Sequence, residues 1–383
     1  MTQHKPLAGV RVLDLTQLLP GPMCTLHLAD MGAEVIKIEP PRGGDPTRGL
    51  DGEQFNGMFL MLNRNKRSLA LDLRSEEGVA VLHRLAERAD VLVEGFRPGV
   101  AERLGIGYAR LAEINPRLVY CSISGYGQDG PLAQAAGHDI NYESLAGVLE
   151  QTGAAGGAPA QGNFPVADLA GGALSAAMGI LAALLGARSS GRGCHVDVSM
   201  TDCLMVHNIM STLSWQRAGQ AVPRGADYLS GAIACYGVYE TADGRHLAVG
   251  AIESKFWTAF CDVIERPELY ARGHVGGSKG AEARAEVAAV IRSQTLAYWQ
   301  TVFADVDACV TPVLRVDEAV AHPHAQARGL LREDIHPVAG RHSSYAFPIR
   351  MSGYRLDEAR PAPALGADNA AIYAELGLAP QAA

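Results

Sequence analysis

The sequence predicts an α/β protein, with a large domain built on a parallel sheet and a smaller α+β domain, on three observations. The chain has 383 residues, a length typical of two domains. Residues 1–125 alternate short β-branched runs with stretches of helical period, which is the pattern of β-α-β units in a parallel sheet. From about residue 230 the pattern changes, and Asp243-Gly244 between two alternating segments indicates a β-hairpin.

Each element is expected from a local signal. Strands are predicted where β-branched and apolar residues cluster, at residues 10–15, 34–39, 68–73, 90–94, 119–124, 195–199, 236–241 and 246–251. Helices are predicted where apolar residues recur with helical spacing, at residues 23–31, 75–88, 100–113, from 140 onward, 169–187, 202–217, 255–265, 281–303 and 369–376. Gly32 stands where a helix C-cap is expected.

The order of these elements predicts how the chain is divided. We expect a large domain from residues 1–199 and 330–383, a linker helix region at 200–228, and a small domain with its return linker at 229–329. The tail beyond about residue 330 bears prolines and ends in a helix that could pack back on the first domain. The small domain is therefore expected to be inserted before a C-terminal return rather than appended.

Composition excludes several classes of protein. With 48% hydrophobic residues, 19% charged residues and a net charge of −8, the chain is neither disordered nor suited to a nucleic-acid or anionic membrane surface. Its 7 cysteines form no CxxC pair, so we expect reduced thiols in a cytoplasmic protein and no metal site. Residues 169–187 are uncharged and could just span a bilayer, but a helix buried on all sides of a soluble core is the better interpretation.

Basic side chains gather near the expected strand ends. They are Lys37, Arg42, Arg48 and the run Asn63-Arg64-Asn65-Lys66-Arg67. Such a patch suits phosphates held at the carboxyl edge of a parallel sheet, and a solvated rim is an equally good interpretation. The turn LLPGP after the first strand is of the strand–helix kind that binds anions, but it does not match G-x-G-x-x-G.

Four residues are candidates for proton chemistry. His138 lies between a glycine-rich loop and a helix start, where it is either a pocket residue or a buried histidine with a satisfied hydrogen bond. Asp139 is interpreted as an N-cap. Asp168 stands at the mouth of the apolar helix, as an N-cap or as a carboxylate in a dry site. Glu253 ends the second hairpin strand, where a rim ion pair is usual.

Several blocks of the chain, taken in order, resemble the family III CoA-transferases and their relatives, the α-methylacyl-CoA racemases. They are GVRVLDLTQLLPGPMCTLHLADMGAEVIKIEPPRGGDPTR, LNRNKRSLALDL, VLVEGFRPG and YCSISGYGQDGP. The resemblance runs nearly end to end. It implies a Rossmann-like large domain, a smaller domain, and two chains interlocked into a homodimer.

The resemblance also implies where CoA and the acyl group are held. The carried-over candidates for CoA or substrate contact are Arg42, Asn63, Arg64, Lys66, Arg67, Arg97, Asp139 and Tyr236. The expected partners are an acyl-CoA substrate and a second copy of the chain, with no nucleic acid and no membrane insertion. No cofactor is implied beyond CoA as the thioester carrier, and no metal.

The choice between racemisation and CoA transfer depends on Asp168 and His138. Both branches of the family place an aspartate at the start of the apolar helix, and the racemase branch adds a histidine where His138 stands. The resemblance implies racemisation of 2-methylacyl-CoA esters by proton transfer at Cα, with Glu253 orienting His138 and with N–H groups of the Asp168 helix facing the thioester oxygen. The alternatives are a CoA-transferase that uses Asp168 covalently and a non-catalytic acyl-CoA binding protein.

Overall fold

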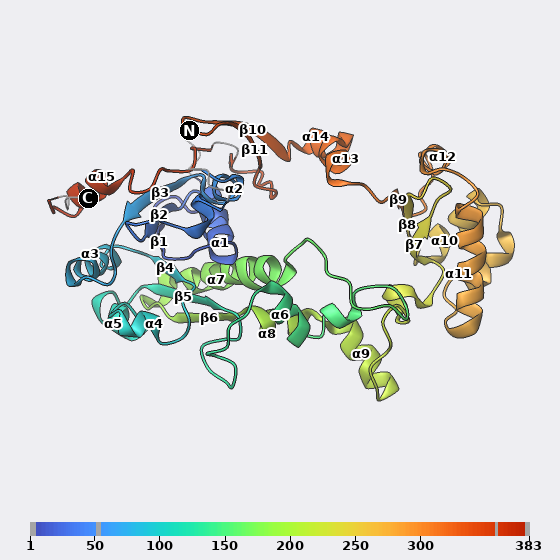
Figure 1. Ribbon diagram of the computed structural model, residues 1–383, viewed down its shortest axis with the longest axis horizontal. Helices are drawn as coiled ribbons and strands as arrows, with labels where there is room; N and C mark the ends of the chain where they lie inside the picture. The colour runs from blue at the N-terminus through green and yellow to red at the C-terminus, as the bar shows by residue number, and fades with distance from the viewer. Residues whose placement is uncertain (1–4, 51–54, 357–358, 380–383) are drawn as a thin grey trace. The chain divides into compact units, whose positions relative to one another are not determined.

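The computed structural model describes residues 5–50, 55–356 and 359–379, which form two compact units (Figure 1). Unit 1 comprises Met1–Ala146, Asn163–His207 and Pro323–Ala383, and unit 2 comprises Gly147–Gly162 and Asn208–His322. The small domain is thus inserted before a C-terminal return, but its borders differ from those expected. One cause is Arg224, whose guanidinium pairs with Glu150 and donates to the carbonyl of Gly157, so that residues 147–162 are tied to unit 2.

Unit 1 is built on one sheet of six parallel strands. They are β1 (Arg11–Asp14), β2 (Glu34–Glu39), β3 (Lys66–Ala70), β4 (Val91–Glu94), β5 (Val119–Ser124) and β6 (His195–Ser199). Their order is β3-β2-β1-β4-β5-β6, and every neighbouring pair is parallel. This is the Rossmann-type order, which reverses between β1 and β4 and leaves a crevice at the carboxyl ends of those strands. The predicted α/β class and parallel sheet are confirmed.

Helices cover both faces of this sheet (Figure 1). In unit 1 they are α1 (Pro20–Asp30), α2 (Gly57–Asn63), α3 (Glu76–Ala86), α4 (Val100–Arg103), α5 (Tyr108–Ile114), α6 (Asp139–Leu145), the π-helical η3 (Ala167–Leu174), α7 (Ser175–Ser190), α8 (Met200–His207), α14 (Pro323–Arg328) and α15 (Asn369–Glu375), with the short η1 (Pro46–Arg48). Side chains of α3, α4, α5 and α15 form an apolar core with one face of the strands, whereas α1 and α7 contact the other face. The expected helix at 100–113 is two helices, because Gly105 between them has φ +73°.

The apolar helix that begins with η3 and continues through α7 is long and apolar enough to cross a membrane by length and composition alone, over Ala167–Ser190. Only 39% of an apolar 18-residue stretch of this helix is buried, so the expectation of burial on all sides is wrong. Its small residues pack closely, with Gly171 and Gly172 against Met200, whereas Met178 on another side is 67% exposed.

The C-terminal segment covers the outer edge of β3. A hairpin of β10 (Leu331–His336) and β11 (Gly340–Tyr345) precedes it. The N–H of Ser68 donates to the carboxylate of Asp368 at 2.9 Å, and the N–H of Ala70 donates to Asn369 Oδ1 at 2.9 Å. Ile372 on α15 lies in the same core as the strands. The predicted packing of the last helix on the first domain is confirmed.

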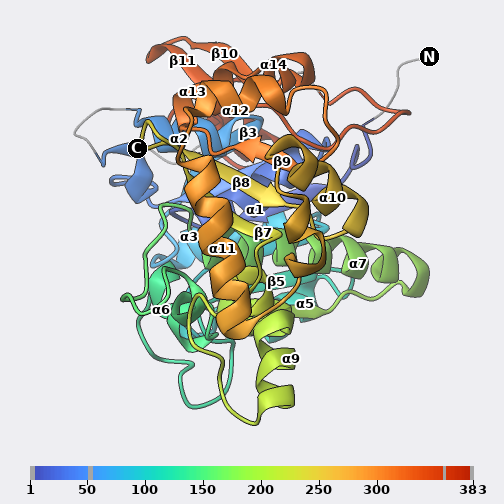
Figure 2. The ribbon, with the colours of Figure 1, turned by 90° about the vertical axis from the view of Figure 1, so that its right-hand side faces the viewer.

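Unit 2 holds a small antiparallel sheet of β7 (Tyr236–Glu240), β8 (His246–Gly250) and β9 (Val310–Pro312). Its helices are α9 (Ile209–Ala218), α10 (Ser254–Val263), α11 (Gly277–Ile291), α12 (Leu296–Val302) and α13 (Val316–Ala321), with the short turns η2 (Leu149–Gln151), η4 (Tyr228–Ala232) and η5 (Pro267–Arg272). Helix α11 packs along β7 (Figure 2). The predicted hairpin is confirmed, and Gly244 takes φ +69° in its turn.

Candidate active site

Two cavities of unit 1 lie where the strand order reverses, at the carboxyl ends of the strands. Cavity A has a volume of about 570 Å³ and is lined by residues that follow β1, β2, β3 and β4. Cavity B has a volume of about 360 Å³ and is lined by residues that follow β1, β4 and β5, together with His138 and Asp168. Gln17 and Phe96 line both cavities, so they form a shared wall. Ligands of open α/β sheets bind at this edge.

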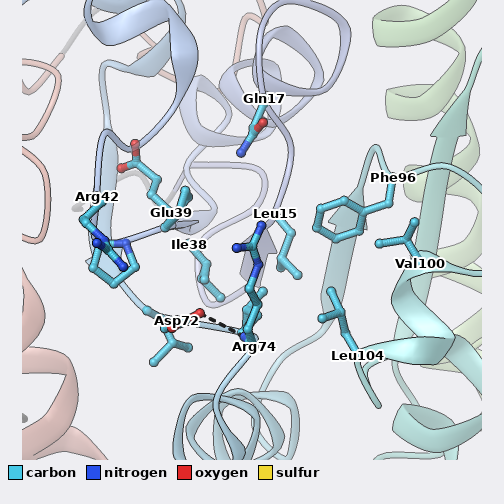
Figure 3. A pocket seen from close by; sticks show the side chains of 14 residues that line it. Leu15, Gln17, Ile38, Glu39, Arg42, Asp72, Arg74, Phe96, Val100 and Leu104 are labelled. Carbon is cyan, nitrogen blue, oxygen red and sulfur yellow. Dashed lines mark hydrogen bonds between the residues drawn. The ribbon is translucent and has the colours of Figure 1, made fainter. Parts of the chain in front are cut away.

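Cavity A has charged side chains, Arg42 and Arg74 together with the carboxylates of Glu39 and Asp72, and an apolar side (Figure 3). Arg42, which follows β2, and Arg74, which follows β3, are both exposed and line it. Phe96, Val100 and Leu104 lie across the cavity from Arg42. This combination suits an anion joined to a flat apolar group. Sequence reasoning missed Arg74, although it follows the end of its strand just as Arg42 does.

Buried charges hold the loop that runs from β1 between the cavities. Two ion pairs with fully buried side chains lie beneath it. Lys66 Nζ is 3.1 Å from Asp14 Oδ2, and Lys37 Nζ is 2.8 Å from Asp45 Oδ2. Burial alone would raise the pKa of Asp14, but the charges of Lys66 and Lys37 hold it at about 2. Lys37 Nζ then donates to the carbonyl of Thr16 at 2.9 Å.

The same network accounts for an unusual backbone conformation at the tip of this loop. Leu18 has φ +67°, which non-glycine residues rarely adopt, and its N–H donates to Asp45 Oδ1 at 3.3 Å. The side chain of Asp45 is fully buried and paired with Lys37. The position of the loop is therefore set from inside the protein, below the cavities.

Four of the predicted CoA contacts face the interior of unit 1. Asn63 is fully buried and accepts from Lys66 Nζ at 2.9 Å, and Arg64 pairs with the buried Asp30 at 2.5 Å. Arg67 pairs with carboxylates on β2 and near the C-terminus. None of the four lines cavity A or B, because residues 63–67 precede or begin β3 whereas both cavities lie past strand ends. Their contact with CoA stays a prediction.

His138 and Asp168 come together at cavity B, although 29 residues separate them in sequence. His138 is exposed at the start of α6, which contradicts the buried-histidine interpretation, and its N–H donates to Asn141 Oδ1 at 3.0 Å. Asp168 is half-buried inside η3, whose N-cap is Val166, so the N-cap interpretation of Asp168 is wrong. Arg97, also predicted, is exposed and lines the same cavity.

Asp139 joins the two helices that carry this pair. It is the first residue of α6 rather than its cap, and its Oδ1 accepts the N–H of Asp168 at 2.9 Å. Burial raises the pKa of Asp168 to about 6; the negative charge of Asp139 adds to the rise and His138 opposes it. A carboxyl that titrates so close to neutrality is suited both to accept and to return a proton.

The hydrogen bond from Asp168 to Asp139 changes the expected source of oxyanion stabilisation. The N–H of Asp168 is taken by Asp139, and the N–H of Leu169 donates to the carbonyl of Pro165 at 3.0 Å. These first N–H groups of the helix are therefore not available to a thioester oxygen, and that expectation is wrong for both. No local sequence signal predicts this hydrogen bond, because the acceptor lies 29 residues earlier in the chain.

Glu253 and Tyr236 belong to unit 2. Glu253 is the exposed N-cap residue of α10, and its carbonyl accepts from Trp257 N at 3.1 Å. Tyr236 is half-buried at the start of β7, and its carbonyl accepts from Arg284 at 3.3 Å. Their roles beside His138 stay predictions.

Comparison with known proteins agrees with this architecture. The family model for CoA-transferase family III matches residues 7–369. The chain is 38% identical to the alpha-methylacyl-CoA racemase of Mus musculus over 362 residues, 94% of this chain and 86% of the relative. It is 33% identical to the succinyl-CoA:glutarate CoA-transferase of Homo sapiens over 389 residues, 98% of this chain and 87% of the relative.

The same likeness extends to three dimensions. A crystal structure of a CAIB/BAIF family protein from Brucella suis superposes with a TM-score of 0.82 and 30% identity, covering 98% of this chain and 100% of that one. The chain belongs to CoA-transferase family III.

Proposed function

We propose that the protein racemises 2-methylacyl-CoA thioesters by proton transfer at Cα. The observation that carries the proposal is that His138 and Asp168 line one cavity from two different helices. Inversion at a carbon requires one group to remove a proton and a second group to return one to the opposite face. Two titratable side chains at one cavity supply that pair, and the relative that is 38% identical carries the racemase name.

The proton and electron balance closes with these two residues. One of them, in its basic form, takes the proton from Cα, and the C–H electron pair forms the carbon–carbon double bond of an enolate whose charge rests on the thioester oxygen. The other, in its acidic form, protonates the opposite face, and the oxygen returns its electron pair to the carbonyl. The two residues have then exchanged protonation states, so the next turnover begins from the opposite epimer.

The enolate oxygen needs hydrogen-bond donors that are not already engaged. Helix α6 begins at Asp139, and the first N–H groups of a helix have no partner within it. In the described part of the chain, the N–H groups of Asn141 and Tyr142 donate to the carbonyl of His138, whereas no acceptor is recorded for the N–H of Asp139. We place the thioester oxygen at that N–H, beside His138.

Cavity A is where we place the nucleotide end of CoA. Arg42 and Arg74 supply charge for phosphates, and Phe96 with its apolar neighbours supplies surface for the adenine. The thioester end would pass Gln17 and Phe96 into cavity B. Arg97 lines cavity B, on the side of the thioester end.

The test is exchange at Cα. A chiral 2-methylacyl-CoA incubated in D2O with the protein should gain deuterium at Cα and lose optical purity together. His138→Gln and Asp168→Asn should each abolish inversion, whereas Asp129→Asn, an exposed carboxylate in a loop outside both cavities, should not change it. Absence of both deuterium and inversion in the wild-type protein would refute the proposal.

A second candidate is transfer of CoA between an acyl-CoA and a free carboxylate. It is favoured by the similarity to a glutarate CoA-transferase at 33% identity and by the half-buried carboxylate of Asp168, which could attack the thioester carbonyl. Hydroxylamine trapping during turnover, followed by mass spectrometry of the Asp168 peptide, separates the two reactions. A hydroxamate on Asp168 assigns the transferase. Tight acyl-CoA binding with neither adduct nor exchange would assign a binding protein.

We also propose that two copies of the chain associate. Unit 1 exposes large apolar side chains along α7 and α8, among them Met178 at 67%, Leu185 at 69% and Val206 at 68%. A row of this kind on a soluble protein usually marks a protein interface. Sedimentation equilibrium at micromolar concentration should give twice the chain mass of 40.4 kDa, and a monomer there would count against it.

A further inference from the structure

Glu94 lies at the end of β4, where the chain turns into the wall shared by the two cavities. Glu94 is 3% exposed, and its Oε2 accepts a hydrogen bond from the N–H of Phe96 at 2.6 Å. Residues 95–98 all line cavity B, and Phe96 lines cavity A as well. The carboxylate, which lines neither cavity, therefore holds one of the two segments that form the shared wall, the other being the loop with Gln17.

Few other bonds hold this segment. The carbonyl of Pro98 accepts from Gln134 Nε2 at 3.0 Å, and the carbonyl of Arg97 accepts from Val100 N at 3.1 Å. Both lie at the far end of the segment, toward α4. Near β4 the backbone of the segment is held by the hydrogen bond from Phe96 N–H to Glu94, and the ring of Phe96 packs against the apolar core of unit 1. The hydrogen bond therefore contributes to the position of Phe96 together with this packing.

The surroundings of Glu94 are acidic or neutral. Ser122 on β5 stands beside it in register and hydrogen bonds to it, and His195 Nε2 lies 2.9 Å from the same hydroxyl. Carboxylates face it from α4, at Glu102, and from β6, at Asp197; Tyr120 and Cys121 on β5 are the remaining titratable neighbours. In the part of the chain that is described, no ion pair joins Glu94 to a cation.

Burial without a cation raises the free energy of an ionised carboxyl. Burial raises the pKa of Glu94 to about 7, with smaller contributions in the same direction from the charges of Glu102 and Asp197 and in the opposite direction from the hydrogen bonds of Ser122 and Phe96. An ionised oxygen accepts an N–H bond about twice as strongly as a neutral one. The group therefore passes from a strong to a weak acceptor within the neutral range of pH.

We infer that Glu94 is a positioning residue for CoA-ester binding: its carboxylate holds Phe96 and the shared wall in the binding conformation, and its protonation releases them. The inference rests on the proposed function only in that the two cavities take the CoA ester. Beyond the proposed function, it assigns to Glu94 a pH-dependent hydrogen bond that contacts neither the reacting atoms nor the ligand. Affinity for the ester should then fall as the pH is lowered from 8 to 6, before the fold is lost.

The test measures binding rather than turnover, so the proton transfers of His138 and Asp168 do not enter it, and the titration of Asp168 in cavity B is common to the wild type and the Glu94 variants. Acetyl-CoA is titrated calorimetrically into the full-length protein at pH 8, 7 and 6. If only the ionised form binds, the apparent Kd rises about tenfold between pH 8 and pH 6. Glu94→Gln is a neutral acceptor that resembles the protonated carboxyl and has no proton to gain, so its Kd should stay near the wild-type value at pH 6 and lack the rise that Glu94 causes. Glu94→Ala should bind weakly at every pH.

The comparison of variants removes the probe's own titration, since a phosphate also gains a proton near pH 6. Glu113→Gln, on the exposed side of α5, is the matched control and should keep the wild-type rise. A Glu94→Gln profile that follows the wild type, or Glu94→Ala binding as tightly as wild type at pH 8, overturns the inference. Wild-type protein that binds no acetyl-CoA at pH 8 instead overturns the proposed function, so the two failures are distinguishable.

Discussion

Replacing Asp168 by asparagine should make unit 1 more stable while it abolishes the reaction. The pKa of Asp168 is raised from 3.8 to about 6, chiefly by burial, so the folded state holds a proton that the unfolded chain releases. A folded pKa above the unfolded value gives stability that is present at low pH and is lost as the pH rises through about 6. Asparagine resembles the protonated carboxyl and avoids that loss.

The magnitude follows from the shift. About 2.2 pKa units at about 1.36 kcal/mol per unit give a gain of up to roughly 3 kcal/mol at pH 8. The gain falls to about half that at pH 5 and to about 0.5 kcal/mol at pH 4, because the folded state is then protonated and the unfolded chain is increasingly protonated as well. For a unit of this size, roughly 3 kcal/mol corresponds to about 6–12 °C in Tm.

The assay is differential scanning calorimetry between pH 4 and pH 8. Tryptophan fluorescence is unsuitable, because Trp215, Trp257 and Trp299 all belong to unit 2 and report on it alone. Asp129→Asn, at an exposed site, should change Tm by little at any pH. The reasoning is refuted if Asp168→Asn is no more stable than wild type at pH 8, or if its advantage does not shrink toward pH 4.

Three further results are expected. Asp139→Asn keeps an acceptor for the N–H of Asp168 but removes the charge that raises its pKa, so the acidic limb of the pH–rate profile should move to lower pH. Arg42→Ala and Arg74→Ala should each weaken acetyl-CoA binding by roughly tenfold and reduce its salt dependence, measured by calorimetric titration at two ionic strengths. Lys66→Met leaves the buried carboxylate at the end of β1 without its partner, and should lower the free energy of unfolding by about 3–5 kcal/mol in a denaturant titration followed by circular dichroism.

The parallel sheet could be predicted because its signals are local. The strands at 34–39, 119–124 and 195–199 were predicted with the bounds that the structure has, since each is a short run rich in apolar or β-branched residues. The hairpin of β10 and β11 was missed for the opposite reason. Its strands, LREDIH and GRHSSY, are mostly polar and show no alternation, so nothing in the chain separates them from loop.

The candidate site could be predicted in part. His138 and Asp168 were identified by type and sequence context, and the structure brings both to one cavity. The burial of the Lys66 side chain could not be predicted, because its partner Asp14 is 52 residues away and lies on β1, with β2 between the two strands. Glu94 was interpreted only as the end of a strand, since its hydrogen bond to Phe96 depends on the local path of the turn. Ion pairs and turn geometry of this kind are properties of the folded chain.

The hydrogen bonds from Ser68 to Asp368 and from Ala70 to Asn369 also bear on how the protein is made. Strand β3 is at the edge of the sheet, and the side chains of Asp368 and Asn369 accept hydrogen bonds from its outward N–H groups. A ribosome completes β3 about 300 residues before it releases the segment that closes this edge. The nascent chain therefore carries an open strand edge through most of its synthesis, and a truncation or tag that displaces the last helix would leave that edge available to other chains.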